Sequence, residues 1–353
     1  MNRDHFYACV LAGGTGERFW PMSRVRRPKH LLNLLSERTL LEETVRRLEG
    51  VVPAQNIFVV TSVAQAADVR AALPQLPAAQ IIAKPARRDS GPAAALATGL
   101  VRARDPAAVV ALLAADASIH DSARFGAQLG AALAWAANSP ELLTFAVRPR
   151  YPATGFGYLE LAEELGRSEG GAIRRVRRFV EKPDAATAQQ YLAAGNYAWN
   201  ASIFVWQAAV FLAEAERQAP ALAALVRDFP AGDCTRYLAD HFPGLPRISV
   251  DYALMEKATR VAAVVAEFDW DDVGTWTALP THLQPDAADN TVRGQVIAVD
   301  SSHNIAVSNG RVIALCGVKD LVVVETPDAV LVCHRDAVQE LKKLQPLLPK
   351  EVL

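Results

Sequence analysis

The sequence lacks long hydrophobic runs, a leader pattern and a sizeable net charge, and each absence excludes a class of protein. No apolar stretch approaches the ~18 residues that a membrane-spanning helix needs. Arg3, Asp4 and His5 lead directly into an apolar run, which is not the pattern of a signal peptide. The net charge of −1 creates no overall field that would attract nucleic acid or an anionic membrane surface. We therefore expect neither a nucleic acid nor a membrane as partner.

Cysteines are also few, and none has the CxxC spacing of a metal or redox site. The four are Cys9, Cys234, Cys316 and Cys333. Cys9 and Cys316 lie in apolar runs typical of strands, so we expect both to be buried, reduced thiols in a cytoplasmic protein.

Apolar residues make up 51% of the 353 residues, enough for a sizeable core. Through the first two thirds of the chain, short apolar runs alternate with helical patterns. Strands are expected at 7–11, 57–61, 109–113, 142–147 and 203–206, and helices at 40–48, 93–104 and 126–137. This alternation predicts an α/β fold with a doubly wound, mostly parallel sheet covered on both faces.

The pattern of predicted elements changes after a polar, non-periodic stretch at 280–290. Strands are then expected at 295–299, 304–307, 312–315, 321–325 and 329–333, a spacing typical of all-β units. Asn309-Gly310 predicts a tight turn between two of them, and a final helix is expected at 335–344, ended by Pro346. We therefore expect a large domain over 1–285 and a small β-rich domain over 286–353.

Residues 11–31 are the most informative stretch. Gly13, Gly14 and Gly16 follow the first strand, where open α/β sheets bind ligands. Glycines allow backbone N–H groups to approach phosphate oxygens. The loop has neither the GxxxxGK[ST] of a P-loop nor the GxGxxG of a dinucleotide site. The cations that follow are Arg18, Arg24, Arg26, Arg27 and Lys29. A phosphate-handling loop is one interpretation, and a structural turn with solvated arginines is the other.

Two acidic features could hold a divalent cation. Asp116 follows the apolar strand 109–113, where it could bind a cation or cap the next helix. The segment FDWDDVGTW, residues 268–276, places three aspartates within four positions. Like charges this close repel unless they are solvated or bound to metal, and the two tryptophans favour a packed setting over a solvated loop.

The string LAGGTGERFWPMSRVRRPKHLL, residues 11–32, closely resembles the opening motif of sugar-phosphate nucleotidylyltransferases. Its Phe19-Trp20-Pro21 and Ser23-Arg24 resemble the mannose-1-phosphate guanylyltransferase branch. The resemblance implies a Rossmann-like nucleotidyltransferase fold with a small C-terminal β-helix-like domain. It further implies transfer of GMP from GTP to mannose 1-phosphate with release of pyrophosphate, by an enzyme that we expect to be a homodimer. The chain ends soon after the β domain, so we expect no isomerase activity.

The resemblance also implies roles for single residues. In the loop, Leu11, Ala12, Gly13, Gly14 and Gly16 would bind the nucleotide, and Arg18 and Lys29 would neutralise its phosphates. Asp116 and Asp272 would hold Mg²⁺ or Mn²⁺, with Asp269 and Asp271 in supporting roles.

By resemblance, the sugar pocket would be formed by RFVEKPD together with TGFGYLEL, residues 154–161, and YAWNASIFVW, residues 197–206, whereas SVDYALMEKA matches a separate family motif. In RFVEKPD, residues 178–184, Glu181 would accept bonds from sugar hydroxyls and Lys182 would contact the sugar phosphate, although this pair could also be an ordinary surface ion pair. Gly157 and Asn200 would complete the pocket. In SVDYALMEKA, residues 249–258, Asp251 and Glu256 could orient neighbours, or Asp251 could cap a helix.

The chain departs from the family at two places. KPARRDSGP, residues 84–92, has Lys84, Asp89 and Ser90 where the family has Glu, Asn and Thr, and keeps Arg88. By resemblance Arg88, Asp89 and Ser90 border the base; Asp89 could accept from guanine, or pair with Arg87 or Arg88. Ser202 stands where the family has Gly. These departures leave open a different nucleotide or sugar 1-phosphate, and a non-catalytic nucleotide-sugar sensor is the remaining alternative.

Overall fold

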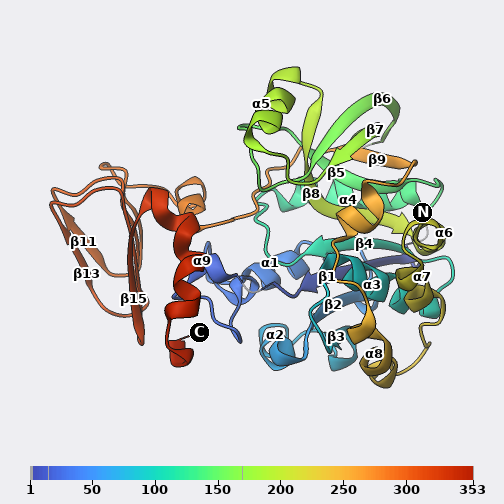
Figure 1. Cartoon of the computed structure of the whole chain (residues 1–353), viewed down its shortest axis with the longest axis horizontal. Coiled ribbons are helices and arrows are strands. Elements are labelled where there is room, and N and C mark those ends of the chain that lie inside the picture. The colour runs from blue at the N-terminus through green and yellow to red at the C-terminus, as the bar shows by residue number, and fades with distance from the viewer. Residues whose placement is uncertain (1–2, 15, 169, 353) are drawn as a thin grey trace.

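The computed structural model describes residues 3–14, 16–168 and 170–352. Within them a nine-stranded sheet forms the large domain, in the order β3-β2-β1-β4-β8-β5-β9-β7-β6 (Figure 1). Its first half contains β3 (Ile81–Lys84), β2 (Ile57–Ser62), β1 (Phe6–Ala12) and β4 (Val109–Ala114). Its second half contains β8 (Tyr197–Gln207), β5 (Leu142–Val147), β9 (Val261–Val265), β7 (Gly171–Val180) and β6 (Tyr158–Ser168).

All strands of this sheet run in one direction except β7 and β8. The predicted mostly parallel α/β fold is therefore confirmed. The antiparallel hairpin of β6 and β7, and strands β3 and β9, were not predicted.

Helices cover both faces because the strands are apolar on both sides. Along β1, Phe6, Ala8 and Val10 face one core, and Tyr7 and Cys9 face the other. The first core is covered by α1 (Leu40–Arg46), α2 (Ala66–Ala72), α4 (Ser122–Ala136) and α5 (Ala185–Ala194). The second is covered by α3 (Ser90–Arg104), α6 (Ala208–Gln218), α7 (Pro220–Arg227) and α8 (Thr235–His241).

The C-terminal strands coil between two small sheets, as in a β-helix. One sheet has the order β10-β12-β14-β15, and the other pairs β11 with β13. Their bounds are β10 (Thr291–Arg293), β11 (Val296–Val299), β12 (Ile305–Val307), β13 (Ile313–Cys316), β14 (Leu321–Thr326) and β15 (Ala329–His334). Successive strands up to β14 alternate between the sheets and pair in parallel, and β15 closes the unit antiparallel to β14. The small β-helix-like domain is thus confirmed, and its exact boundary at 285/286 stays a prediction.

Two details of this domain differ from expectation, and the turn predicted at Asn309-Gly310 takes a particular form. It is a bend between β12 and β13, which lie in different sheets, so it forms a corner of the coil. Cys9 is buried as expected, but Cys316 is exposed, because Ile313 and Leu315 take the inward positions of β13. The final helix is broken into a 3₁₀ stretch, η9 (Arg335–Glu340), then α9 (Leu341–Leu344) and a further 3₁₀ turn that contains Pro346.

Candidate active site

The glycine loop lies at the carboxyl end of β1 and packs against the turn that carries Lys29. Gly16 has φ +64°, and a Cβ there would lie 2.5 Å from the Lys29 backbone nitrogen. Any other residue would push the loop off η2 (Lys29–Leu31). At Gly14, by contrast, a Cβ would meet no described atom within 4 Å, so this part of the loop borders open space.

Lys29 joins the two predicted metal ligands. Its Nζ lies 3.0 Å from Asp116 Oδ2 and donates to the backbone carbonyl of Asp272. Burial alone would raise the pKa of Asp116, but the Lys29 ammonium outweighs burial and holds this pKa below its ordinary value. Burial raises the pKa of Asp272, and the charges of Asp116 and Asp271 add to this effect. The structure therefore brings together two segments 156 positions apart in the sequence.

The cap alternative for Asp116 is excluded, because another residue takes that place. Asp121 is the N-cap of α4 and accepts from the Arg124 backbone N–H at 2.9 Å. Asp116 therefore does not cap α4, and its carboxylate, just after the end of β4, pairs with Lys29.

The segment 268–276, here called the acidic loop, contains two further aspartates, and both hold the loop in place. Asp269 accepts from the backbone N–H groups of His120 and Asp121, and lies 2.6 Å from His120 Nδ1. Asp271 accepts from the Val273 N–H, and its backbone forms a two-bond bridge with Ser118. Asp272 is thus presented by a loop that is fixed against the end of β4.

A cavity of about 240 Å³ lies between these parts. It is lined by Gly16, Glu17, Arg18, Phe19, Lys29, Asp116, Asp272, Gly274 and Lys342. Arg18 Nε is buried without a hydrogen-bond partner among the described residues. The cavity thus combines carboxylates with cations, one of which has an unused donor, as a site for a metal-bound polyphosphate requires.

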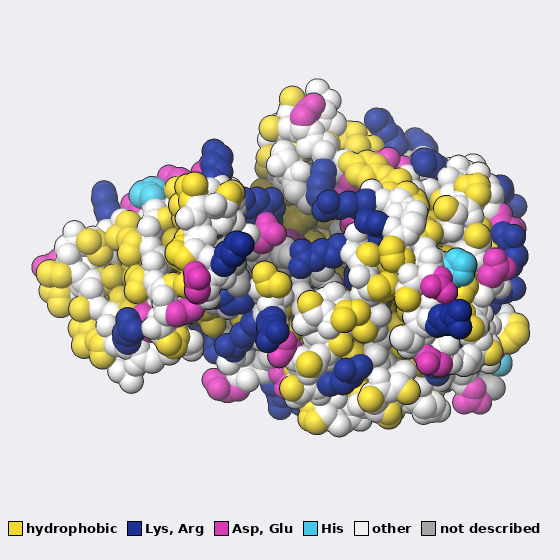
Figure 2. All heavy atoms as spheres, turned by 60° about the horizontal axis from the view of Figure 1, so that its bottom comes forward, with side chains coloured by type: hydrophobic (Ala, Val, Ile, Leu, Met, Phe, Trp, Pro, Cys, Tyr) yellow, Lys and Arg dark blue, Asp and Glu magenta, His cyan; other side chains and the backbone are white. Residues whose placement is uncertain are grey.

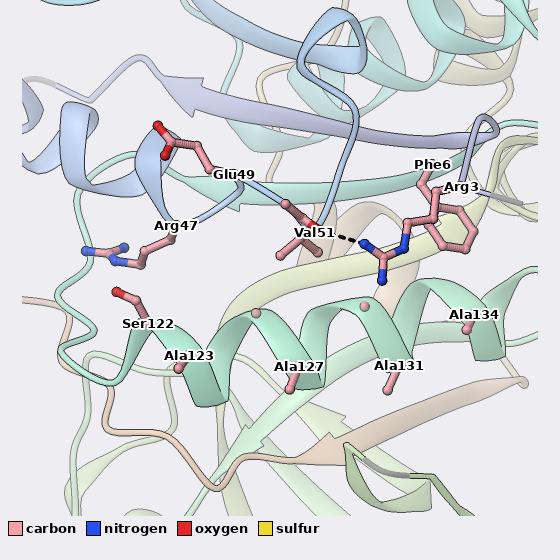
Figure 3. Close-up of a pocket in the computed structure, with 13 residues that line it drawn as sticks. Arg3, Phe6, Arg47, Glu49, Val51, Ser122, Ala123, Ala127, Ala131 and Ala134 are labelled. Atoms are coloured by element: carbon pink, nitrogen blue, oxygen red, sulfur yellow. Dashed lines mark hydrogen bonds between the residues drawn. The ribbon is translucent and has the colours of Figure 1, made fainter. Parts of the chain in front are cut away.

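Figure 2 shows the molecule hollowed between the C-terminal domain and the large domain, with Lys and Arg side chains gathered around the hollow. A larger cavity, about 600 Å³, lies elsewhere, between α4 and the chain that follows α1 (Figure 3). Small side chains of α4 such as Ala127 and Ala131 form much of its wall. The described residues that line it include none of the predicted site residues, so the site predicted from the sequence does not coincide with this larger cavity.

The predicted sugar-binding residues also come together. Lys182 Nζ donates to Glu181 Oε1 at 2.6 Å, and a Cβ on Gly157 would lie 2.6 Å from Glu181 Oε2. The Asn200 backbone N–H donates to the Gly157 carbonyl at 2.8 Å. The Glu181 side chain is only 8% exposed whereas that of Lys182 is 57% exposed, so the carboxylate lies inside the cluster and the ammonium at its edge.

Asp251 and Thr144 fix Asn200 within this cluster. Asn200 Oδ1 accepts from Thr144 Oγ1 at 2.6 Å, and Asn200 Nδ2 donates to Asp251 Oδ1 at 3.2 Å. Burial, together with the Glu181 carboxylate, raises the pKa of Asp251 to about 7. Glu256 accepts from the Glu181 backbone N–H at 2.8 Å. Asp251 and Glu256 thus orient neighbours, and Asp251 is not a helix cap; Thr144 was missed, because only the β5–β8 pairing places it here.

The segment before α3 is largely tied into the framework. Arg88 donates through Nε to the Pro243 carbonyl at 2.9 Å, and Ser90 Oγ accepts from the Val250 N–H at 3.0 Å. Asp89 caps α3 through the Ser90 N–H at 2.8 Å and is exposed; among the described residues it pairs with neither Arg87 nor Arg88. Lys84 is buried, and its Nζ would lie 2.6 Å from a Cβ on Gly13.

The far side of the glycine loop packs into the C-terminal domain. Phe19 and Trp20 belong to one buried cluster with Trp276, Val307 and Leu341. Phe19 meets Trp276 edge to face at 5.0 Å. One hydrophobic core therefore supports the glycine loop, the acidic loop and the β-helix.

Comparison with known families accounts for both domains. Residues 7–288 match the family described as Nucleotidyl transferase, and residues 294–346 match the MannoseP isomerase/GMP-like beta-helix domain. The first match covers most of the chain and defines the class of protein as a nucleotidyl transferase.

Individual relatives narrow the class. Mannose-1-phosphate guanylyltransferase of Escherichia coli K12 is 35% identical over 353 residues, which cover 98% of this chain and 73% of that protein. Xanthan biosynthesis protein XanB of Xanthomonas campestris pv. campestris B100 is 37% identical over 342 residues, which cover 95% and 71%. A Thermus thermophilus crystal structure, described as mannose-1-phosphate geranyltransferase, matches with a TM-score of 0.88 at 33% identity and covers 97% of this chain and 99% of that one. The chain therefore belongs to the nucleotidyl transferase family, in its mannose-1-phosphate guanylyltransferase branch. No helix in the described part of the chain is long and apolar enough to cross a membrane.

Proposed function

We propose that this enzyme transfers GMP from GTP to mannose 1-phosphate and releases pyrophosphate. A phosphate oxygen of the sugar phosphate would attack the α-phosphorus of GTP in line, and pyrophosphate would leave. No side-chain nucleophile is needed, because the attacking oxygen is already ionised. The observation that carries the proposal is the meeting of the Asp116–Lys29–Asp272 cluster with Arg18 at one cavity.

The donor set of this cavity fits Mg²⁺ or Mn²⁺. Within the described residues no group of three or more His, Cys, Asp or Glu side chains could hold a metal. Asp116 and Asp272 supply two carboxylates, and Mg²⁺ typically takes one or two and completes its shell with phosphate oxygens and water. A bound cation would offset the charge of the phosphates during transfer.

The remaining residues would bind and orient the substrates. Arg18 and Lys29 would neutralise the triphosphate, and the loop from Leu11 to Gly16 would approach it with backbone N–H groups. Lys182 would position the attacking phosphate. Burial lowers the pKa of Lys182, but the hydrogen bond to Glu181 outweighs it and raises this pKa overall, which keeps the side chain cationic. Glu181 would bind sugar hydroxyls, as would the second N–H of the Asn200 side-chain amide, the one that does not donate to Asp251.

Asp89 would accept from N1–H and the exocyclic amine of guanine. Its carboxylate is exposed, and one oxygen serves the helix cap. The capping role is an alternative use for the same group, and Lys84 beside Gly13 is a second departure that bears on base choice.

The test is pyrophosphate release across a matrix of nucleoside triphosphates and sugar 1-phosphates with Mg²⁺. We expect turnover with GTP and mannose 1-phosphate to exceed that with every other pair. Higher turnover with another pair would replace the substrate assignment, and absence of turnover with all pairs would favour a nucleotide-sugar sensor. The expected homodimer stays a prediction, as does a cytoplasmic location.

A further inference from the structure

One cation that lines the 240 Å³ cavity, here called the phosphate cavity, comes from the C-terminal domain. Lys342 lies on α9 and lines the cavity together with Arg18, Asp116 and Asp272. Figure 1 shows α9 on the side of the C-terminal strands that faces the large domain. We propose that Lys342 binds the β- and γ-phosphates of the nucleotide and the pyrophosphate they become. This inference rests on the proposed function, in that it takes the cavity to hold a polyphosphate.

The charges of the cavity favour such a role. Glu17, Asp116 and Asp272 are carboxylates, which repel a polyphosphate. Lys29 is already engaged by Asp116 and by the Asp272 carbonyl, so its charge is partly offset. Arg18 and Lys342 are the cavity cations that form no ion pair within the described residues, so they add to the attraction that Lys29 and a bound cation would supply.

The neighbouring lysine offers a contrast within the same helix. Lys343 forms an ion pair with Glu340 on the preceding turn, and it does not line the cavity. Two adjacent lysines of the same chemistry therefore have different surroundings. Only one of them faces the phosphate site.

The position of α9 is fixed by packing. Leu341, next to Lys342, is 3% exposed and lies in the same buried cluster as Phe19. Helix α9 packs against η1 (Glu17–Phe19), the turn that carries Arg18. Trp20 Nε1 also donates to the Val352 carbonyl at 2.9 Å. Lys342 thus has an anchored base and a flexible stem, which suits a point-charge contact with a phosphate group.

The experiment measures pyrophosphate directly, because every nucleotidyl transfer of this class shares that product. Wild type, Lys342→Ala, Lys342→Arg and the control Lys343→Ala are compared by calorimetric binding of pyrophosphate with Mg²⁺, and by the KM for pyrophosphate in the reverse reaction with GDP-mannose. Lys342→Ala should weaken pyrophosphate binding and raise this KM roughly tenfold, as for one lost charge-assisted bond. Lys342→Arg should recover most of the loss, and Lys343→Ala should match wild type. The KM for GDP-mannose should change less than twofold.

The two readouts separate this inference from the substrate assignment. If wild type shows no turnover with any substrate pair but Lys342→Ala still weakens pyrophosphate binding, the proposed function fails and the inference stands. Equal pyrophosphate affinity in wild type and a Lys342→Ala variant with an unchanged melting temperature would overturn the inference. So would equal losses in the Lys342→Ala and Lys343→Ala variants, or no pyrophosphate binding by wild type.

Discussion

Replacing Gly157 with alanine should damage sugar binding while leaving the fold nearly intact. The added methyl group would lie 2.6 Å from Glu181 Oε2 and 3.3 Å from Phe179 Cε1. Gly157 does not have the positive φ that would itself exclude alanine. The strain therefore falls on the Glu181 carboxylate, which is the movable end of a long side chain, and not on the backbone.

The size of the effect follows from what Glu181 would lose. A displaced carboxylate would give up its bond to a sugar hydroxyl, and a hydrogen bond to a charged group is worth about 1.5–3 kcal/mol. The KM for mannose 1-phosphate should rise roughly 10- to 100-fold, since each 1.4 kcal/mol corresponds to a factor of ten. The free energy of unfolding should fall by about 1 kcal/mol, as for a modest overpacking.

The assay is steady-state pyrophosphate release with mannose 1-phosphate varied, accompanied by thermal unfolding. Gly155→Ala is the matched control, because a Cβ at Gly155 meets nothing within 4 Å. In a Glu181→Ala background the Gly157→Ala change should cost little further affinity, since the clashing carboxylate is gone. An unchanged KM in folded Gly157→Ala, or full additivity with Glu181→Ala, would refute the reasoning.

Three further predictions concern the metal, a buried acid and a strained position. Asp272→Asn should lower turnover by roughly 100-fold or more, because it removes one of the two carboxylates proposed to hold the metal. Chelation should abolish wild-type turnover and added Mg²⁺ should restore it, and near-normal turnover in the folded variant would exclude the assignment. Burial, with the Glu181 carboxylate, raises the pKa of Asp251 to about 7, so its contribution to stability is lost as the pH rises from about 4 through 7. The melting temperature of Asp251→Asn should therefore exceed that of wild type at pH 8, and the difference should shrink towards pH 5. A difference in melting temperature that stays constant from pH 5 to pH 8 would contradict the raised pKa. Ser202 has φ +54°, and Ser202→Gly should raise the free energy of unfolding by about 0.5–1 kcal/mol in denaturant titration, since relief of the left-handed strain exceeds the entropy cost of glycine; a lower value would show that the serine is not strained.

Sequence reasoning predicted four of the strands that are apolar on both faces, β1, β2, β4 and β5, but it missed β9, whose VAAVV run is just as apolar. Strands such as β1 and β4 are buried throughout, and each appears in the sequence as an uninterrupted apolar run. The β6–β7 hairpin was missed, because charged, partly buried or exposed residues interrupt its apolar positions. In β7, Arg174, Arg175, Arg177 and Arg178 dilute the apolar signal, although Ile173, Val176 and Phe179 still mark its buried positions.

The candidate site was harder to predict where one residue had two possible roles. Spacing alone could not decide whether Asp116 caps a helix, because the cap depends on the backbone around Asp121. The contact of Asn200 with Asp251 joins residues 51 positions apart and requires the folded sheet. Lys342 gave no signal in the sequence, since its role depends on how the two domains pack.

One feature of the β-helix could have been found by comparing its own coils. Asn290 and Asn304 are both buried and stacked, with Asn290 Oδ1 accepting from Asn304 Nδ2 at 3.0 Å. Asn304 Oδ1 accepts in turn from the Leu321 N–H. The two asparagines lie 14 positions apart, the same offset as between the paired residues Thr291 and Ile305, so they occupy equivalent positions in successive coils.

The buried cluster that joins Phe19 and Trp20 to Val307 and Leu341 has a thermodynamic consequence. Because the glycine loop and the β-helix share one core, opening either of them exposes apolar surface of the other. The two are therefore coupled in their local unfolding, and a nucleotide bound at the loop would also lower the probability that the β-helix opens. Occupancy of the phosphate site should thus slow amide hydrogen exchange in β14, a strand that does not line the cavity.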